Sequence, residues 1–480
     1  MITRKFLTSS VIYTLAGTLP MASAILLLPF YLHYLPAKEF GVLSLYLSFS
    51  ILMQIIITYS FDSSLYLHFH DFKNDWPRLS GFVSSAFTAI LVLGGVVTVI
   101  MLLAGGPIFH LVFQEKKIEF FPYGILSVVT AVFQSVFKVN NNLLQSRERP
   151  VLFLWSNLIS FFLTAALTVT GLKLFPGTLM GPVGGRMLAF IISGLWALRL
   201  IYREFGVHFN VSLLRTTFTY NTFQFIYQLQ QWVINYFDRF LLAVMVLMSD
   251  LGVYDFTIKC LLVIEFVSAA MLNSFFPKII ARSAQNRIEG TSIEINRYYH
   301  GLTAAIMLMV SGTILVLPIL IGIFVNKPGY RSSADLVPFA SLVFLLRGMK
   351  FYFSLPYSLR KDSKPLPVIF LIVSVCKIII SIGLIKRFGI YGAVFATLIS
   401  SGFEIVLFWL WRRRMFNYFF NPLKIIVAPL LLMAAVLTIE PWYPFSIWQA
   451  HLFYVALAFG LLAWLYRREI VLIDFRKLFT

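Results

Sequence analysis

The chain has few charged residues for its length and almost no cysteine. Charged residues make up 12% of its 480 residues, and only 20 residues are Asp or Glu. A soluble domain usually carries about a quarter charged residues, so water is not the main solvent of this chain. The two cysteines, Cys260 and Cys376, both lie in apolar runs. A disulfide framework and a zinc site are therefore excluded.

The chain also lacks the features of an enzyme. It has no G-x-x-x-x-G-K-[ST] sequence, so it does not itself hydrolyse nucleotide. A membrane glycan polymerase, ligase or glycosyltransferase needs a substantial extracytoplasmic loop with catalytic acids or bases. The longest such loop that we predict, near 105–120, is short and offers only Glu115 and Glu119. We therefore expect a protein that is not an enzyme and has no cofactor or metal.

Long apolar runs fill most of the chain. Hydrophobic residues make up 59% of it, and the mean hydropathy is +0.84. A membrane helix needs about 20 mostly apolar residues, and such runs follow one another with short polar breaks. The sequence thus predicts an all-α polytopic membrane protein with about fourteen transmembrane helices. They lie near 7–35, 41–67, 80–104, 120–137, 151–172, 178–200, 217–248, 252–276, 301–325, 335–357, 366–385, 391–411, 423–439 and 449–466.

The formal net charge of +19 is explained by topology. Most Lys and Arg residues fall in alternate loops between the predicted helices. Because cytoplasmic loops are enriched in basic residues, this pattern predicts that both termini face the cytoplasm. No basic face lies outside the membrane except in these short loops, so we expect no nucleic-acid partner.

Two short motifs recur after similar intervals. Glu39–Val42 is echoed by Asp250–Val253, and Ser146–Pro150 is echoed by Lys361–Pro365. Six predicted helices separate each motif from its echo, so the chain returns to the same side of the membrane. The sequence therefore predicts two parallel six-helix lobes, related by an axis along the membrane normal, and a carboxy-terminal helix pair. The predicted boundaries are 1–205, 206–415 and 416–480.

Polar residues recur along the predicted helix near 217–248. Their spacings of three and four place them on one helical stripe, which either bonds packed helices together or lines a water-filled lumen. We favour the lumen, because so long a row exceeds what packing needs and an acid ends it. The stripe consists of Thr217, Asn221, Gln224, Gln228, Gln231, Asn235 and Asp238. Of these, Gln224, Gln228, Gln231 and Asn235 are predicted to bind cargo, and Asp238 is a candidate for ion coupling.

Several basic residues lie within or near predicted spans, where a charge costs at least about 2.5–3.5 kcal/mol unless it faces a cavity or a partner. Arg239 points about 100° away from Asp238 around the helix and is a candidate for substrate binding. Asp255 and Lys259 have the favourable acid-first i,i+4 spacing. They form either a self-neutralising pair or a site for substrate or ion. Arg186 has no assigned partner, and we expect it to reach the membrane interface.

Later spans carry a second group of charges. Arg347 and Lys350 share one helix face with no acid within one turn. We expect this unbalanced pair to bind an anion such as a diphosphate or an acidic sugar, because the guanidinium fork suits phosphate oxygens. Lys377 and Glu404 are expected to pair between neighbouring helices. Glu265 and Glu404 are further candidates for ion coupling.

Three motifs carry a family resemblance. They are Leu35–Val42 with Tyr46, Asp238–Leu242 continuing through Leu251–Tyr254 to Lys259, and Gly389–Ala393. On these motifs the chain resembles the polysaccharide (O-antigen type) flippases of the multidrug/oligosaccharidyl-lipid/polysaccharide exporter superfamily, over nearly its whole length. The resemblance implies two six-helix lobes in a V-shaped, alternating-access arrangement in the bacterial inner membrane, with a cationic central cavity. The implied cargo is an undecaprenyl-pyrophosphate-linked oligosaccharide of O-antigen, lipopolysaccharide or another surface polysaccharide.

The chain also resembles the fourteen-helix peptidoglycan-precursor flippases, in which the extra carboxy-terminal pair forms a groove for the lipid tail. That branch places essential arginines in its first helix. Here no charge lies between Phe6 and Tyr34, and this departure argues against lipid II as the cargo.

We therefore expect a flippase for a lipid-linked anionic oligosaccharide, with membrane lipid around it. A polysaccharide polymerase and a chain-length regulator are the protein partners that such a role implies. The alternative within transport is an ion-coupled multidrug exporter. It would need an acidic cavity, whereas bases outnumber Asp238, Asp255, Glu265 and Glu404 in the spans.

Overall fold

The protein is described from a computed structural model. All its elements are helices, and the described ranges contain no strand. The structure describes residues 12–13, 16–19, 22–72, 74–113, 118–285, 288–360, 365–412, 421–442 and 447–467. The helices are α2 (Leu28–Tyr34), α3 (Ala37–Thr58), α4 (Phe61–Phe72), α5 (Trp76–Phe113), α6 (Tyr123–Ser146), α7 (Pro150–Leu174), α8 (Met180–Phe205), α9 (Val211–Met245), α10 (Met248–Gln285), α11 (Ile288–Phe324), η2 (Pro328–Tyr330), α12 (Ser333–Arg360), α13 (Pro365–Arg412), η3 (Leu423–Val427), α14 (Ala428–Ile439), η4 (Glu440–Trp442) and α15 (Ile447–Leu465).

The prediction of an all-helical, multi-pass membrane protein is confirmed. Nine helices in the described ranges are long and apolar enough to cross a membrane. The helix α9 is not among them, because its row of Gln and Asn side chains makes it less apolar. Two predicted spans are joined in α13, where Gly389 interrupts the helix with φ 57° and ψ −131°. The count of fourteen and the orientation of the termini stay predictions.

The chain forms two compact units. The first unit consists of Met1–Lys259 and Phe370–Ile390, and the second of Cys260–Ile369 and Tyr391–Thr480. The boundaries thus fall within α10 and α13 rather than in loops. The division at 205 and 415, which follows the sequence repeat, stays a prediction.

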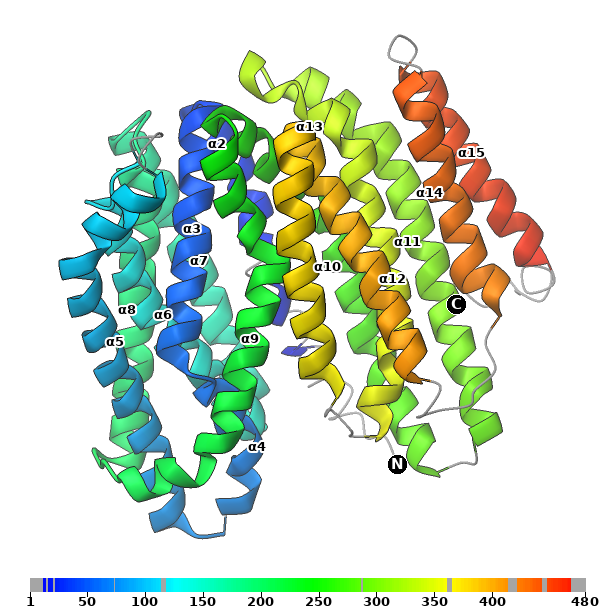
Figure 1. The fold of residues 1–480 in the computed structure, drawn as a ribbon. Coiled ribbons are helices and arrows are strands. Elements are labelled where there is room, and N and C mark those ends of the chain that lie inside the picture. Colours follow the sequence, from blue (N-terminus) through cyan, green and yellow to red (C-terminus); the bar gives the residue numbers. More distant parts are fainter. Residues whose placement is uncertain are drawn as a thin grey trace. The chain divides into compact units, whose positions relative to one another are not determined.

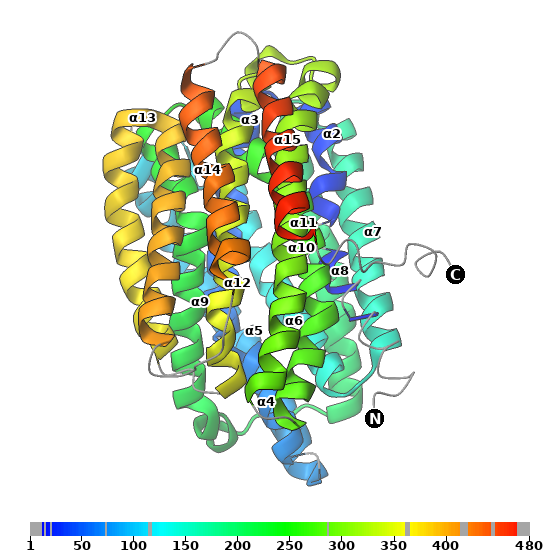
Figure 2. The ribbon, with the colours of Figure 1, turned by 90° about the vertical axis from the view of Figure 1, so that its right-hand side faces the viewer.

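In the first unit, α6 occupies a central position. It packs against α3, α4, α5 and α8, and α8 also packs against α7 (Figure 1). In the second unit, α11 packs against α12 and α15, and α14 packs against α12 and α15 (Figure 2). Glu440 ties α14 to α15, because its carboxylate lies 3.2 Å from His451 Nε2 and accepts a hydrogen bond of 3.0 Å from the Tyr454 hydroxyl.

The single helix predicted near 41–67 is broken in two. Tyr59 and Ser60 have φ values of 43° and 58°, a left-handed conformation that costs a non-glycine residue about 1–2 kcal/mol. The Tyr59 hydroxyl lies 2.7 Å from Thr222 Oγ1, and Ser60 Oγ accepts a hydrogen bond of 3.2 Å from Gln228 Nε2. Side chains of α9 therefore hold the break between α3 and α4. The sequence gives no sign of it, because neither Gly nor Pro stands there.

The echoed motifs meet where α3 crosses α10, within the first unit. A Cβ atom on Gly41 would overlap the carbonyl oxygen of Met248, and one on Gly252 would overlap that of Ala37. Each carbonyl lies four residues before the other glycine, so the contact is reciprocal, as a two-fold axis between repeats would produce. Only glycine allows backbones to approach this closely. In the second echo, residues 361–364 lie outside the described ranges.

Candidate functional site

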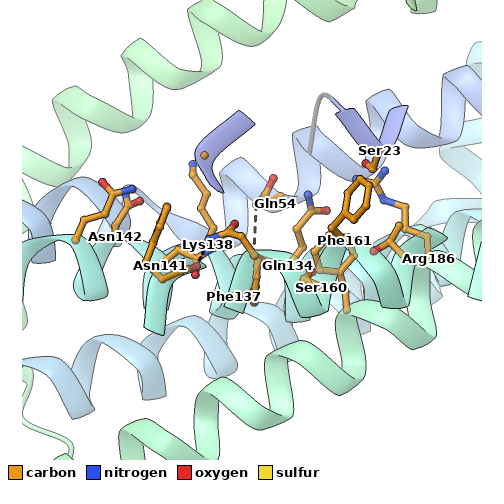
Figure 3. A pocket seen from close by; sticks show the side chains of 16 residues that line it. Ser23, Gln54, Gln134, Phe137, Lys138, Asn141, Asn142, Ser160, Phe161 and Arg186 are labelled. Atoms are coloured by element: carbon orange, nitrogen blue, oxygen red, sulfur yellow. Dashed lines mark hydrogen bonds between the residues drawn. The ribbon is translucent and has the colours of Figure 1, made fainter. Parts of the chain in front are cut away.

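The first unit contains a polar cavity of about 300 Å³ beside α6, which we call the α6 cavity. Its volume is at the lower end of the range for small-molecule sites. Among the described residues, its wall contains two bases and no acid (Figure 3). The lining residues are Gly17, Ser23, Gln54, Gln134, Phe137, Lys138, Asn141, Asn142, Gln145, Phe153, Asn157, Ser160, Phe161, Thr164, Arg186 and Phe190.

One face of α6 supplies the largest share of this wall. Gln134, Lys138, Asn141 and Gln145 are spaced by four, three and four residues, which places them on one stripe. This helix was predicted to end near residue 137, which would leave Lys138 in a loop. This was wrong, because α6 continues to Ser146. The stripe spacing was the signal that could have revealed the site.

Amide side chains give the cavity both donors and acceptors. Asn141 Nδ2 donates to Asn157 Oδ1 at 3.1 Å, and Ser156 Oγ donates to Asn141 Oδ1 at 3.0 Å. Gln134 Oε1, in contrast, is buried and has no hydrogen-bond partner among the described residues. An unpaired buried acceptor costs about 1–3 kcal/mol, so a ligand that donates a hydrogen bond would be stabilised there. With Phe137 and Phe161 in the same wall, the cavity combines amides and aromatic faces.

Arg186 of α8 lines the same cavity. Its guanidinium lies 5.4 Å from the Phe190 ring centroid, and its buried Nε has no hydrogen-bond partner in the described ranges. Within the part of the chain that the structure describes, no carboxylate lies within ion-pair distance of it. Arg186 therefore offers an uncompensated positive charge to the cavity, and its expected reach to the membrane interface stays a prediction.

Lys138, the other base of the wall, has a partner. Its Nζ lies 2.9 Å from Asp62 Oδ2 and 3.4 Å from Gln228 Oε1. Gln228 Nε2 donates to Asp62 Oδ1 at 3.2 Å. Figure 3 shows Lys138 and Arg186 toward opposite ends of the labelled residues, with Gln134 between them. At one end of the cavity the charge of Lys138 is neutralised by Asp62, and at the other end the charge of Arg186 is not paired with any described carboxylate.

A buried ion-pair cluster, consisting of Asp238, Arg239, Asp255, Lys259 and Lys377, lies in the same unit. Asp255 accepts from Arg239 Nε at 2.9 Å and lies 2.7 Å from Lys259 Nζ. Asp238 Oδ2 lies 2.8 Å from Lys377 Nζ and accepts from the Tyr254 hydroxyl at 3.3 Å. Three bases face two acids, so the cluster keeps a positive charge. Of the two interpretations of Asp255 and Lys259, the geometry supports the ion pair. A role in substrate or ion binding stays a prediction for Arg239 and Lys259, and for Asp238 and Asp255.

The structure corrects the expected Lys377–Glu404 pair. Lys377 pairs with Asp238 and donates to the Ile234 carbonyl, whereas Glu404 pairs with Lys350 at 2.7 Å. Each charge was expected to find an intramembrane partner, and each does. The partner of Lys377 differs from the expected one because α9, and not the next predicted helix along the chain, supplies the acid.

The second unit also corrects the view that Arg347 and Lys350 are unbalanced. Arg347 Nη1 lies 2.7 Å from Glu265 Oε2, and Lys350 pairs with the buried Glu404. Both acids come from other helices, α10 and α13, so a search within one turn of α12 could not find them. Arg347 and Lys350 as anion ligands, and Glu265 and Glu404 as ion-coupling groups, stay predictions.

The polar stripe of α9 is partly used for packing. Thr217, Asn221 and Asp238 are buried. The four predicted cargo ligands are half-buried, and Gln228 among them bonds Ser60 and Asp62. Contact of Gln224, Gln228, Gln231 and Asn235 with cargo stays a prediction.

Comparisons with known proteins bear on family and fold. The sequence model of the family described as "Polysaccharide biosynthesis protein" matches residues 6–284. A comparison with curated proteins finds no match.

Solved structures resemble most of the chain. The structure of "Lipid II flippase MurJ, inward closed conformation" covers 96% of this chain and 100% of its own, with a TM-score of 0.75 and 13% identity. An inward-facing "multidrug resistance MATE family transporter of the MOP superfamily" covers 86% of this chain and 98% of its own, with a TM-score of 0.68 and 13% identity. A structure of "MATE multidrug transporter DinF-BH" covers 86% and 96%, with a TM-score of 0.59 and 15% identity. At these identities the likeness shows a shared fold.

Proposed function

The chain belongs to the polysaccharide biosynthesis protein family, and from this premise we propose that it is a flippase for an undecaprenyl-pyrophosphate-linked oligosaccharide. In this proposal the protein works in the bacterial inner membrane, on the repeat unit of O-antigen, lipopolysaccharide or another surface polysaccharide. The sugar head crosses through a polar path by alternating access while the polyprenyl tail stays in lipid. A polymerase and a chain-length regulator then use the product.

The observation that carries this proposal is Arg186 in the α6 cavity. A free guanidinium in a wall of amides and aromatic rings suits a ligand that has both hydroxyl groups and negative charge. Arg binds phosphate and carboxylate oxygens through its fork of donors. A sugar chain on a diphosphate has this combination of groups.

The alternative is an exporter of cationic drugs, which the MATE fold likeness keeps open. Such cargo needs a carboxylate to receive it. The wall of the α6 cavity, within the described ranges, contains Lys138 and Arg186 and no acid. The electrostatics of this cavity therefore favour the anionic cargo.

The test is flipping in vesicles made with the purified protein. A short lipid-linked oligosaccharide is added to one leaflet, and its exposure on the other side is followed by cleavage with an impermeant glycosidase. Arg186→Gln should slow flipping about tenfold or more, because it removes a charge-assisted contact of about 1.5–3 kcal/mol. Arg199→Gln, an exposed arginine on the same helix, should behave as wild type. Equal rates for wild type and Arg186→Gln would contradict the proposal.

A further inference from the structure

At the Lys138 end of the α6 cavity, the partly exposed Lys138 forms an ion pair with the buried Asp62. The Lys138 side chain is 35% exposed and lines the cavity, whereas the Asp62 side chain is 5% exposed and does not line it. A ligand in the cavity can therefore reach the ammonium group but not the carboxylate. Any anion that binds at this end must compete with Asp62 for Lys138.

Asp62 is held by more than Lys138. It stands in the first turn of α4, where the free amides of a helix start favour a negative charge. Gln228 Nε2 donates to its other oxygen at 3.2 Å. Asp62 thus keeps stabilising contacts when the ammonium moves away.

Lys138 is the mobile partner. Its charge is at the end of a flexible four-carbon stem. Its contacts are the Asp62 carboxylate at 2.9 Å and the side-chain amide oxygen of Gln228, Oε1, at 3.4 Å. A move into the cavity breaks these contacts and requires a new anion in return. The ammonium therefore leaves Asp62 only when the ligand supplies that anion.

We propose that Asp62 is an internal substitute for an anionic group of the cargo, and that Lys138 exchanges Asp62 for that group when cargo fills the cavity. This inference rests on the proposed function. Arg186 is then the permanent anion receptor, and Lys138 is a second receptor that Asp62 keeps occupied in the empty protein. A neutral sugar cannot displace the carboxylate, so Asp62 selects cargo with a second anionic group, whether phosphate or sugar carboxylate.

The experiment measures binding of inorganic pyrophosphate to the full-length protein in nanodiscs by calorimetry. Wild type is compared with Arg186→Gln, with Arg186→Gln/Asp62→Asn, and with a triple variant that adds Lys138→Gln. Arg186→Gln should weaken binding about tenfold. Adding Asp62→Asn should raise the pyrophosphate affinity of Arg186→Gln by at least about fivefold, because Lys138 no longer has a competing carboxylate. The triple variant should lose the restored binding.

A matched control is Arg186→Gln/Asp62→Glu, which keeps the competing charge and should restore nothing. If Arg186→Gln weakens binding but Asp62→Asn restores none of it, or if the restored binding survives Lys138→Gln, the exchange is wrong while the proposed function stands. If Arg186→Gln binds pyrophosphate like wild type, Arg186 is not the anion receptor and the proposed function itself fails.

If the variants with Asp62→Asn do not fold, the single variant Lys138→Gln tests the exchange. It removes a receptor and leaves Asp62 as an uncompensated anion beside the cavity, so pyrophosphate binding should weaken about tenfold or more. Unchanged affinity would overturn the proposal.

Discussion

The Asp238–Lys377 pair should be a main determinant of the stability of the first unit. Both side chains are almost fully buried, at 3% and 2% exposure, and their charged atoms are 2.8 Å apart. Replacing Lys377 with Met leaves a buried carboxylate whose remaining contacts include the Tyr254 hydroxyl at 3.3 Å. Breaking a buried pair from one side costs about 3–5 kcal/mol, because the other charge stays desolvated.

The assay is thermal unfolding of the purified protein in detergent, compared at equal protein and lipid concentrations. Lys377→Met should lower the Tm strongly, and Asp238→Asn should lower it too, because it leaves the Lys377 ammonium buried. The double variant removes both charges and should be more stable than the sum of the two single effects predicts. Lys173→Met, at an exposed lysine of α7, is the control and should be nearly neutral. Additive losses in the double variant, or a wild-type Tm for Lys377→Met, would refute the reasoning.

Three further variants, and one glycine control, test the packing, each by its Tm. Gly252→Ala should destabilise by several kcal/mol, because its methyl group would overlap backbone atoms, whereas Gly95→Ala, with no atom within 4 Å of the added Cβ, should be neutral or slightly stabilising, by up to about 1 kcal/mol. Lys350→Met should destabilise the second unit by about 3–5 kcal/mol, because it removes the cation that pairs with the buried Glu404; a neutral effect would show that water solvates that acid. Asn210→Ala should cost about 0.5–2 kcal/mol, because the Asn210 side chain accepts from the backbone amides of Ser212 and Leu213 at the start of α9; no change in Tm would mean that this cap contributes nothing.

Periodicity and composition predicted the all-helical architecture and some local contacts. The i,i+4 spacing of Asp255 and Lys259 predicted a possible ion pair, and the structure contains it at 2.7 Å. The reciprocal Gly41–Gly252 crossing likewise matches a repeat that is visible in the sequence. In both cases the information lies within one helical turn or one repeated motif.

Contacts between distant residues could not be predicted in the same way. Lys377 and Asp238 are 139 residues apart, and the order of the predicted helices favoured Glu404 on the next helix as the partner of that lysine. The choice depends on which helices are neighbours and how each is rotated. The Lys138–Asp62 pair was missed for a further reason, because the end of α6 was predicted too early and the lysine was placed in the loop that follows.

The Gly41–Gly252 crossing has the form of an isologous interface. In a C2 dimer the same patch meets itself, so that residue i of one copy contacts residue j of the other and j contacts i. Here Gly41 faces Met248 and Gly252 faces Ala37, which is that relation between two stretches of a single polypeptide. The crossing therefore has, within one polypeptide, the geometry of a self-complementary dimer contact. In a symmetric dimer of a six-helix protein, a single glycine position would supply both of these close backbone contacts.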